Sequence, residues 1–87
     1  MSERCFIVLS RPWCHLCDDF TAALAPLANE LGWRITVLDI DEHPQYLLQW
    51  DEKVPVLLVD DVQLCHYHLD ESKVRAYCAN FPLESGV

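Results

Sequence analysis

The chain has 87 residues and a formal net charge of −8; 52 % of its residues are apolar and only two are glycine. This composition predicts a single compact domain over residues 1–87, without a linker or a disordered tail. The negative charge argues against nucleic acid and membranes as partners, because both present anionic surfaces. No stretch approaches the roughly 20 apolar residues of a membrane span. The first ten residues lack the pattern of a secretory signal, so we expect a cytoplasmic protein.

The first half of the chain predicts a strand, a helix and a second strand. Residues 5–10, CFIVLS, form a short apolar run that is typical of a buried strand. A helical stripe of apolar residues follows; Gly32 is expected to end this helix, and Pro26 falls on its solvent side. The stripe consists of Leu16, Phe20, Ala23, Leu24, Leu27 and Leu31. Residues 33–40, WRITVLDI, predict a second strand that is covered on both faces and parallel to the first.

The second half predicts a short helix, a hairpin and a closing helix. Pro44 opens a helix through residues 45–50. In residues 53–68, KVPVLLVDDVQLCHYH, two apolar runs flank a pair of aspartates, which indicates a β-hairpin. Asp70 is the expected cap of the closing helix. The apolar stripe of that helix consists of Val74, Tyr77, Cys78 and Phe81. The resulting order, β-α-β-α-β-β-α, predicts an α/β fold with a four-stranded mixed sheet and helices on both faces.

Two cysteines, Cys14 and Cys17, stand between the first strand and the first helix, in the stretch VLSRPWCHLCDDF. A Cys-x-x-Cys pair at such a junction is typical of a redox motif, although one such spacing among five cysteines can also arise by chance. Backbone N–H groups and the dipole at the start of a helix stabilise a thiolate, so Cys14 is the candidate nucleophile. Cys17 lies one helical turn further, within reach of a mixed disulfide on Cys14. Cys5 and Cys78 fit apolar patterns and are expected to be buried.

A proline begins the third apolar run, in Val54-Pro55-Val56. Because proline cannot donate to a sheet ladder, one interpretation is an edge strand. The CHLC and VPV motifs together resemble those of the thioredoxin superfamily, and most closely those of short bacterial glutaredoxin-like proteins, over nearly the whole chain. The resemblance implies a thioredoxin-like, glutaredoxin-type fold. It also implies that the Val54–Pro55 bond is cis and faces the cysteine pair, with the backbone of Val54 pairing with the substrate.

The same resemblance implies a thiol–disulfide oxidoreductase that acts on a protein or small-molecule disulfide. Cys14 attacks and Cys17 resolves in this interpretation. No cofactor is expected to be bound, and the electrons come from a reductase or from glutathione as a co-substrate.

Three residues beside the cysteines are further candidates for substrate contacts. Arg11 stands where glutaredoxins often place a lysine for a glutathione carboxylate or for the thiolate; it could equally be an ordinary solvated arginine. Trp13 is either a flat substrate-facing surface or a core aromatic residue. His15, as a cation between the cysteines, would lower a thiol pKa. The carboxylates of Asp18 and Asp19 oppose that effect.

The sequence departs from the glutaredoxin pattern after the hairpin, where the usual Gly-Gly is replaced by Cys65 and His66. Side chains at these positions would crowd bound glutathione. Together with His68 they offer thiolate and imidazole ligands, so a zinc or iron–sulfur module is a second candidate function. Residues 65 and 66 point to opposite faces of a strand while 66 and 68 share one, so no metal is assigned. Cys65 could instead be a third redox thiol, and the whole domain could be a non-catalytic interaction module.

Overall fold

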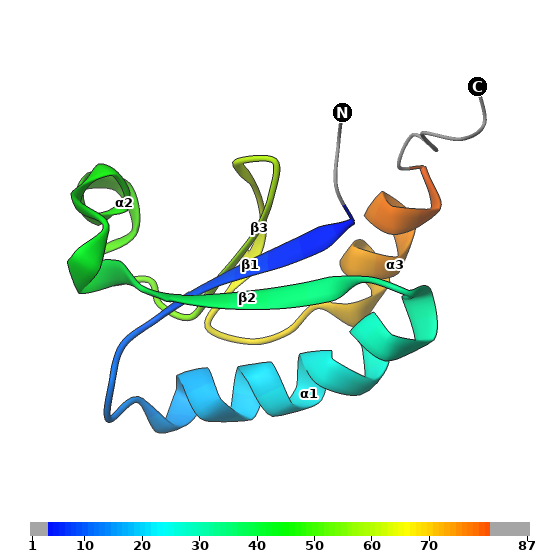
Figure 1. The fold of residues 1–87 in the computed structure, drawn as a ribbon, viewed down its shortest axis with the longest axis horizontal. Helices are drawn as coiled ribbons and strands as arrows, with labels where there is room; N and C mark the ends of the chain where they lie inside the picture. Colours follow the sequence, from blue (N-terminus) through cyan, green and yellow to red (C-terminus); the bar gives the residue numbers. More distant parts are fainter. Residues whose placement is uncertain (1–3, 81–87) are drawn as a thin grey trace.

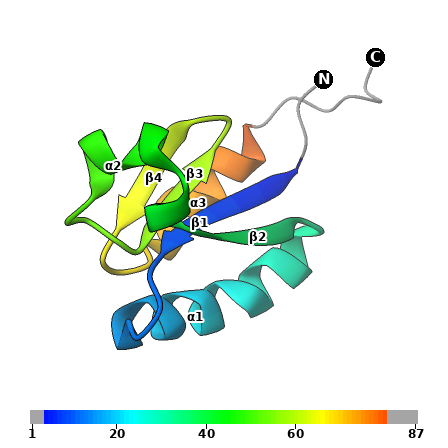
Figure 2. The ribbon, with the colours of Figure 1, turned by 60° about the vertical axis from the view of Figure 1, so that its left-hand side comes forward.

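The computed structural model describes residues 4–80, and its centre is a four-stranded sheet in the order β2-β1-β3-β4 (Figure 1 and Figure 2). β1 (Cys5–Ser10) and β2 (Arg34–Asp39) run parallel to each other. β3 (Val56–Val59) pairs antiparallel with β1 and with β4 (Val62–His66). The sheet is therefore mixed, as the sequence predicts.

Helices cover both faces of this sheet. α1 (His15–Leu31) connects β1 with β2, and α3 (Glu71–Ala79) packs against the same core as α1. α2 (Pro44–Trp50) lies on the opposite face, at one end of the sheet (Figure 2). It is preceded by a short 3-10 helix, η1 (Ile40–Glu42), which is an addition to the predicted elements. The predicted order β-α-β-α-β-β-α and the placement of helices on both faces are confirmed.

The core is divided in two by the alternation of side chains along β1 and β3. The cluster under α1 and α3 consists of Phe6, Val8, Phe20, Leu24, Leu27, Ala28, Trp33, Leu57, Val59, Leu64 and Val74. The cluster under α2 consists of Leu9, Ile40, Trp50, Val56 and Leu58. Because successive side chains of a strand point to opposite faces, the two central strands are buried on both sides.

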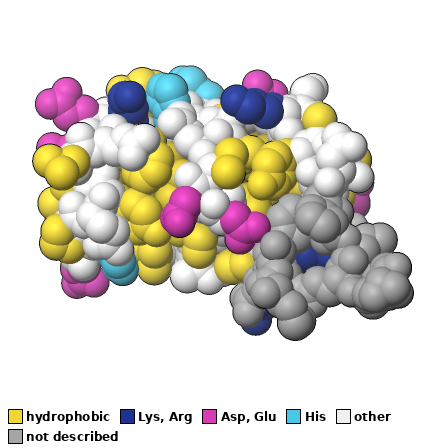
Figure 3. Space-filling view, turned by 90° about the horizontal axis from the view of Figure 1, so that it is seen from above, with side chains coloured by type: hydrophobic (Ala, Val, Ile, Leu, Met, Phe, Trp, Pro, Cys, Tyr) yellow, Lys and Arg dark blue, Asp and Glu magenta, His cyan; other side chains and the backbone are white. Residues whose placement is uncertain are grey.

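β2 is an edge strand, so the prediction that it is covered on both faces is wrong. Val37 is 49 % exposed, and Thr36 is exposed as well. α2 covers only one end of its side of the sheet, and hydrophobic side chains reach the surface on that side (Figure 3). Within residues 33–40, the apolar side chains that are buried are those at the two ends of the run. Trp33 stacks on Phe6 with ring centroids 4.7 Å apart, and Ile40 enters the cluster under α2.

The residues expected to end the elements do so. Gly32 closes α1 with φ 75°, in the left-handed region that glycine adopts without a steric penalty. Asp60 and Asp61 form the hairpin turn with φ 50° and 66°, the signs that a two-residue hairpin turn requires. Asp70 caps α3 by accepting a hydrogen bond from the backbone N–H three residues on, at 3.1 Å. Pro26 lies inside α1 and is exposed, as predicted.

Smaller differences from the predicted core concern three residues, Ala23, Cys5 and Cys78. Ala23 is exposed, and Phe81 lies outside the described residues. Cys5 and Cys78 are only partly buried, because Cys5 begins β1 beside the edge strand and Cys78 lies near the end of α3. Within the described residues, no helix has the length and the apolar character needed to cross a bilayer.

Candidate active site

The cysteine pair lies at the start of α1. Cys14 is the N-cap residue, in extended conformation, and Cys17 is in the first turn. The two are joined in a disulfide, with their Cα atoms 5.2 Å apart. The Sγ of Cys14 also accepts a hydrogen bond from the backbone N–H of Cys17 at 3.1 Å. Cys14 therefore uses its sulfur as the helix cap, where other proteins place the oxygen of serine or aspartate.

The two sulfurs differ in access to solvent. Cys17 is 2 % exposed and faces the core, whereas Cys14 is only partly buried. Trp13, directly before Cys14, is 98 % exposed and has φ 66°, so the interpretation of Trp13 as a core aromatic residue is wrong. His15, Asp18 and Asp19 are exposed around the same turn. A reagent from solution thus meets Cys14 beside an apolar surface before it meets Cys17.

The proline loop lies at the same end of the sheet as the cysteine pair. Leu9, near the end of β1, pairs with Val56, the first residue of β3. β1 leads into the loop that carries Cys14, and Pro55 leads into β3. The two loops therefore meet the sheet at neighbouring points. The Val54–Pro55 bond is cis. Because β3 is a central strand and Pro55 precedes its first residue, the edge-strand interpretation is wrong.

Tyr67 holds the proline loop from the side of β4. Its backbone N–H donates to the carbonyl oxygen of Pro55 at 2.8 Å, and its hydroxyl donates to the carbonyl oxygen of Glu52 at 2.9 Å. Tyr67 has φ 65°, a left-handed backbone that non-glycine residues seldom adopt. Its side chain is 41 % exposed.

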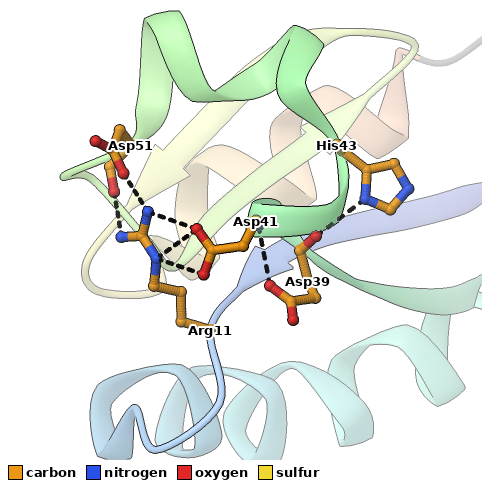
Figure 4. A network of polar contacts seen from close by, with 5 residues as sticks. All are labelled: Arg11, Asp39, Asp41, His43 and Asp51. Carbon is orange, nitrogen blue, oxygen red and sulfur yellow. Dashed lines mark hydrogen bonds and ion pairs between the residues drawn. The ribbon is translucent and has the colours of Figure 1, made fainter.

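Arg11 is neither free nor simply solvated. Its guanidinium donates to the carboxylates of Asp41 in η1 and Asp51 at the end of α2 (Figure 4). The hydrogen bonds that Arg11 donates to Asp41 and Asp51 raise the pKa of Arg11 further above its ordinary range, and the negative charges of the two aspartates add to this effect. The predicted contact of Arg11 with substrate stays a prediction, but the interpretation as an ordinary solvated arginine is wrong.

Cys65 and the two histidines after it do not form one ligand set. Cys65 packs against the core under α1 and α3, and burial raises the pKa of its thiol, which makes it a poorer nucleophile. The Nδ1 of His66 lies 2.7 Å from the Nε2 of Gln63. β4 ends at His66, so His68 does not share a strand face with it, contrary to the prediction. Within residues 4–80, no three histidine, cysteine, aspartate or glutamate side chains gather as a metal site would require.

Comparison with protein families matches residues 6–79 to the family described as "Glutaredoxin-like domain (DUF836)". The chain belongs to this glutaredoxin-like family. A mycobacterial relative, the uncharacterized protein Rv0508 of Mycobacterium tuberculosis, is 28 % identical over 81 residues, which cover 87 % of this chain and 84 % of that protein. A glutaredoxin-like chain with a Cys14–Cys17 disulfide is consistent with thiol redox chemistry.

Solved structures support the same assignment. Protein Ne2328 from Nitrosomonas europaea superposes with a TM-score of 0.78 at 34 % identity, covering 88 % of this chain and 93 % of that one. Protein XcR50 from X. campestris gives 0.67 at 26 % identity, covering 88 % and 99 %. The thioredoxin of Fasciola hepatica gives 0.59 at 15 % identity, covering 93 % and 83 %, a likeness of fold alone. The predicted thioredoxin-like fold and the family resemblance are therefore confirmed.

Three residues around the site carry no local sequence signal. Asp41 and Asp51 lie 30 and 40 residues from Arg11 along the chain, and no motif pairs them with it. Tyr67 follows the end of β4, and its two bonds to the proline loop depend on the hairpin register. Sequence patterns within single elements carry no information about such contacts between loops.

Proposed function

We propose that the protein is a thiol–disulfide oxidoreductase of the glutaredoxin-like type, with Cys14 as the nucleophile and Cys17 as the resolving thiol. The observation that supports this most is the difference between the two sulfurs. Cys14 is accessible at the N-cap of α1, and Cys17 is 2 % exposed behind it. The backbone N–H that lies 3.1 Å from the Sγ of Cys14 favours negative charge on that sulfur, because a thiolate accepts more strongly than a thiol.

Exchange proceeds in two steps, each of which breaks one S–S bond and forms another. The Cys14 thiolate attacks a substrate disulfide, a mixed disulfide forms, and the first substrate sulfur leaves as a thiolate and takes up a proton. The Cys17 thiolate then attacks the Sγ of Cys14 and releases the second substrate thiolate. The substrate gains the two electrons that the dithiol loses. A dithiol reductase or two molecules of glutathione return those electrons by the reverse steps.

Val54 and Pro55 form the substrate platform in this proposal. Their loop ends at β3 beside the end of β1. In the proposal, a disulfide bound to Cys14 pairs with the backbone of Val54. Trp13, directly before the nucleophile in the chain, adds an exposed apolar surface. His15 adds an exposed imidazole between the two cysteines. The substrate is a protein or small-molecule disulfide, and the protein works in the cytosol, where a reductant pool regenerates the dithiol.

Alkylation kinetics of the reduced protein test the proposal. Cys14 is measured in the Cys17→Ser variant, with a variant that lacks both cysteines as the blank. At about pH 6.5, where an ordinary thiol is only about 1 % ionised, Cys14 should react with iodoacetamide roughly tenfold faster than free cysteine. The reduction potential of the wild-type dithiol should fall within roughly −120 to −270 mV.

Two outcomes would reject the proposal. Reactivity of Cys14 no greater than that of free cysteine leaves a non-catalytic interaction module. Stoichiometric zinc or iron in protein purified under reducing conditions, lost on substitution of Cys14 or Cys65, indicates a metal-binding module. Turnover with a reductase but not with glutathione would reject only the glutathione part, because the dithiol chemistry is the same with both.

A further inference from the structure

One arginine side chain joins three separate segments beside the candidate active site. Arg11 lies in the loop between β1 and α1, three residues before Cys14. Its Nε lies 3.2 Å from each carboxylate oxygen of Asp41, in η1. Its Nη1 donates to the backbone carbonyl of Asp51 at 2.6 Å, and its Nη2 donates to the carboxylates of both aspartates (Figure 4). All three guanidinium nitrogens are therefore engaged.

The position of Asp51 gives these bonds their significance. Asp51 is the C-cap of α2 and stands three residues before Val54. Arg11 therefore connects the loop that presents Cys14 with the loop that presents Val54 and Pro55. Tyr67 ties the proline loop to β4 through Glu52 and Pro55, and Arg11 ties the same loop to the cysteine side.

We propose that Arg11 is a positioning residue that fixes the proline loop relative to Cys14 through Asp41 and Asp51. The inference rests on the proposed function, since it assigns Arg11 to the same exchange reaction. Exchange needs the attacking, central and leaving sulfurs nearly in line, so a displaced platform lowers the rate. Only a planar guanidinium presents the several donors in fixed directions that this contact uses.

The charge of the cluster also defines the preferred substrate class. One guanidinium faces two carboxylates, so the cluster carries a net charge of −1, and its arginine stands three residues before Cys14. Arg11 is thus not available to bind the carboxylate of an anionic disulfide. The preferred substrates are neutral or cationic disulfides.

Arg75 provides a matched control at the other end of α1. Its Nη1 and Nη2 lie 2.7 and 3.0 Å from the carboxylate of Glu30, in the last turn of α1, and its Nε lies 2.8 Å from Glu71 in α3. It is again one guanidinium shared by two carboxylates on different elements. It has no connection to the dithiol loops, so Arg75→Gln reports the general cost of losing a surface ion cluster.

The test compares Arg11→Gln, Arg11→Lys and Asp51→Asn with Arg75→Gln. The substrates are bis(2-hydroxyethyl) disulfide, which is neutral, and glutathione disulfide, which is anionic. Arg11→Gln and Asp51→Asn should each lower kcat/KM for the neutral disulfide by about tenfold, within the roughly 100-fold that a 1 Å misplacement can cost. Arg11→Lys should not restore the rate, and Arg75→Gln should stay within about twofold of wild type. The pH profile of Cys14 alkylation should be the same in all variants.

Three results would overturn the inference. If Asp51→Asn leaves kcat/KM for the neutral disulfide unchanged and increases it only for glutathione disulfide, Arg11 is an anion site that Asp51 masks and not a positioning residue. If Arg11→Gln moves the alkylation profile of Cys14 to higher pH, Arg11 acts on the thiolate directly. If Arg11→Gln matches Arg75→Gln in every assay, the cluster only stabilises the fold.

A second readout separates this inference from the proposed function. Amide hydrogen exchange of residues 51–54 should speed up in Arg11→Gln and Asp51→Asn but not in Arg75→Gln, whatever the chemistry of the dithiol. If wild-type protein exchanges no disulfides, the proposed function fails, and the hydrogen exchange alone decides whether Arg11 holds the loop.

Discussion

The same substitution at two helix positions tests how α1 is held against the sheet. Leu24 lies in the middle of α1 and is 0 % exposed, within the core cluster under α1 and α3. Leu48 lies in α2 and is 98 % exposed. Leu24→Ala and Leu48→Ala remove the same atoms from an α-helix. The difference between their effects on the free energy of unfolding therefore measures the contribution of burial.

The expected loss for Leu24→Ala follows from complete burial. Burying a leucine side chain contributes about 1.5–3 kcal/mol, and the cavity left behind adds to the cost. We expect the free energy of unfolding to fall by about 3 kcal/mol. At about 0.05–0.15 kcal/mol per residue, a domain of this size has a free energy of unfolding of roughly 4–13 kcal/mol, so the loss is a large fraction of the total. The melting temperature should fall by roughly 12–24 °C, at 4–8 °C per kcal/mol.

Urea unfolding and thermal melting of the oxidised protein measure both variants. Leu48→Ala should change the free energy of unfolding by less than about 0.5 kcal/mol, because an exposed side chain gains little from folding. A loss below about 1 kcal/mol for Leu24→Ala, or equal losses for the two variants, would show that α1 is not anchored as described. The position of Cys14 at its first turn would then lack a fixed support.

Three further predictions concern stability. Pro26→Ala should raise the free energy of unfolding by about 1–2 kcal/mol in urea titrations, because it restores a helical N–H inside α1; an unchanged midpoint would contradict this. Asp61→Gly should add about 0.5–1 kcal/mol, since φ 66° suits glycine, whereas Asp61→Ala should not. Burial raises the pKa of Cys65 and Cys78 in the folded protein. Their contribution to the free energy of unfolding is therefore complete below the unfolded pKa of about 8.5, and it is lost as pH rises through the higher pKa values of the folded state. The Cys65→Ala, Cys78→Ala double variant should lose less stability above about pH 8.5 than wild type does.

Most of the fold follows from patterns within single elements. The stripe that ends at Gly32, the paired aspartates at residues 60 and 61, and Asp70 before α3 each specify a local structure without help from distant residues. The continuous apolar runs of β1 and β3 match strands whose successive side chains enter the cores on the two faces of the sheet. Local propensity and the global fold agree at these positions, which is why they could be predicted.

The position of β2 at the sheet edge could not be predicted in the same way. An apolar run is typical of a strand between two layers, and residues 33–40 have one. Strand order depends on which strand β3 joins, and β3 pairs with β1 on the side away from β2. This choice is made by contacts between distant segments, so the composition of β2 carries no signal of it. The partners of Arg11 escaped prediction for the same reason.

Two residues that conflict with local rules, Trp13 and Tyr67, lie beside the candidate site. Trp13 leaves a large apolar side chain in solvent and has a left-handed backbone, and Tyr67 has one too. Asp60 and Asp61 also have positive φ, but the hairpin turn accounts for them. No turn of a paired hairpin accounts for Trp13 or Tyr67, and each is tied to the cysteines or the proline loop, by sequence or by hydrogen bond. Conflicts of this kind are typical of functional sites, so their position agrees with the exchange site that we propose between Cys14 and Pro55.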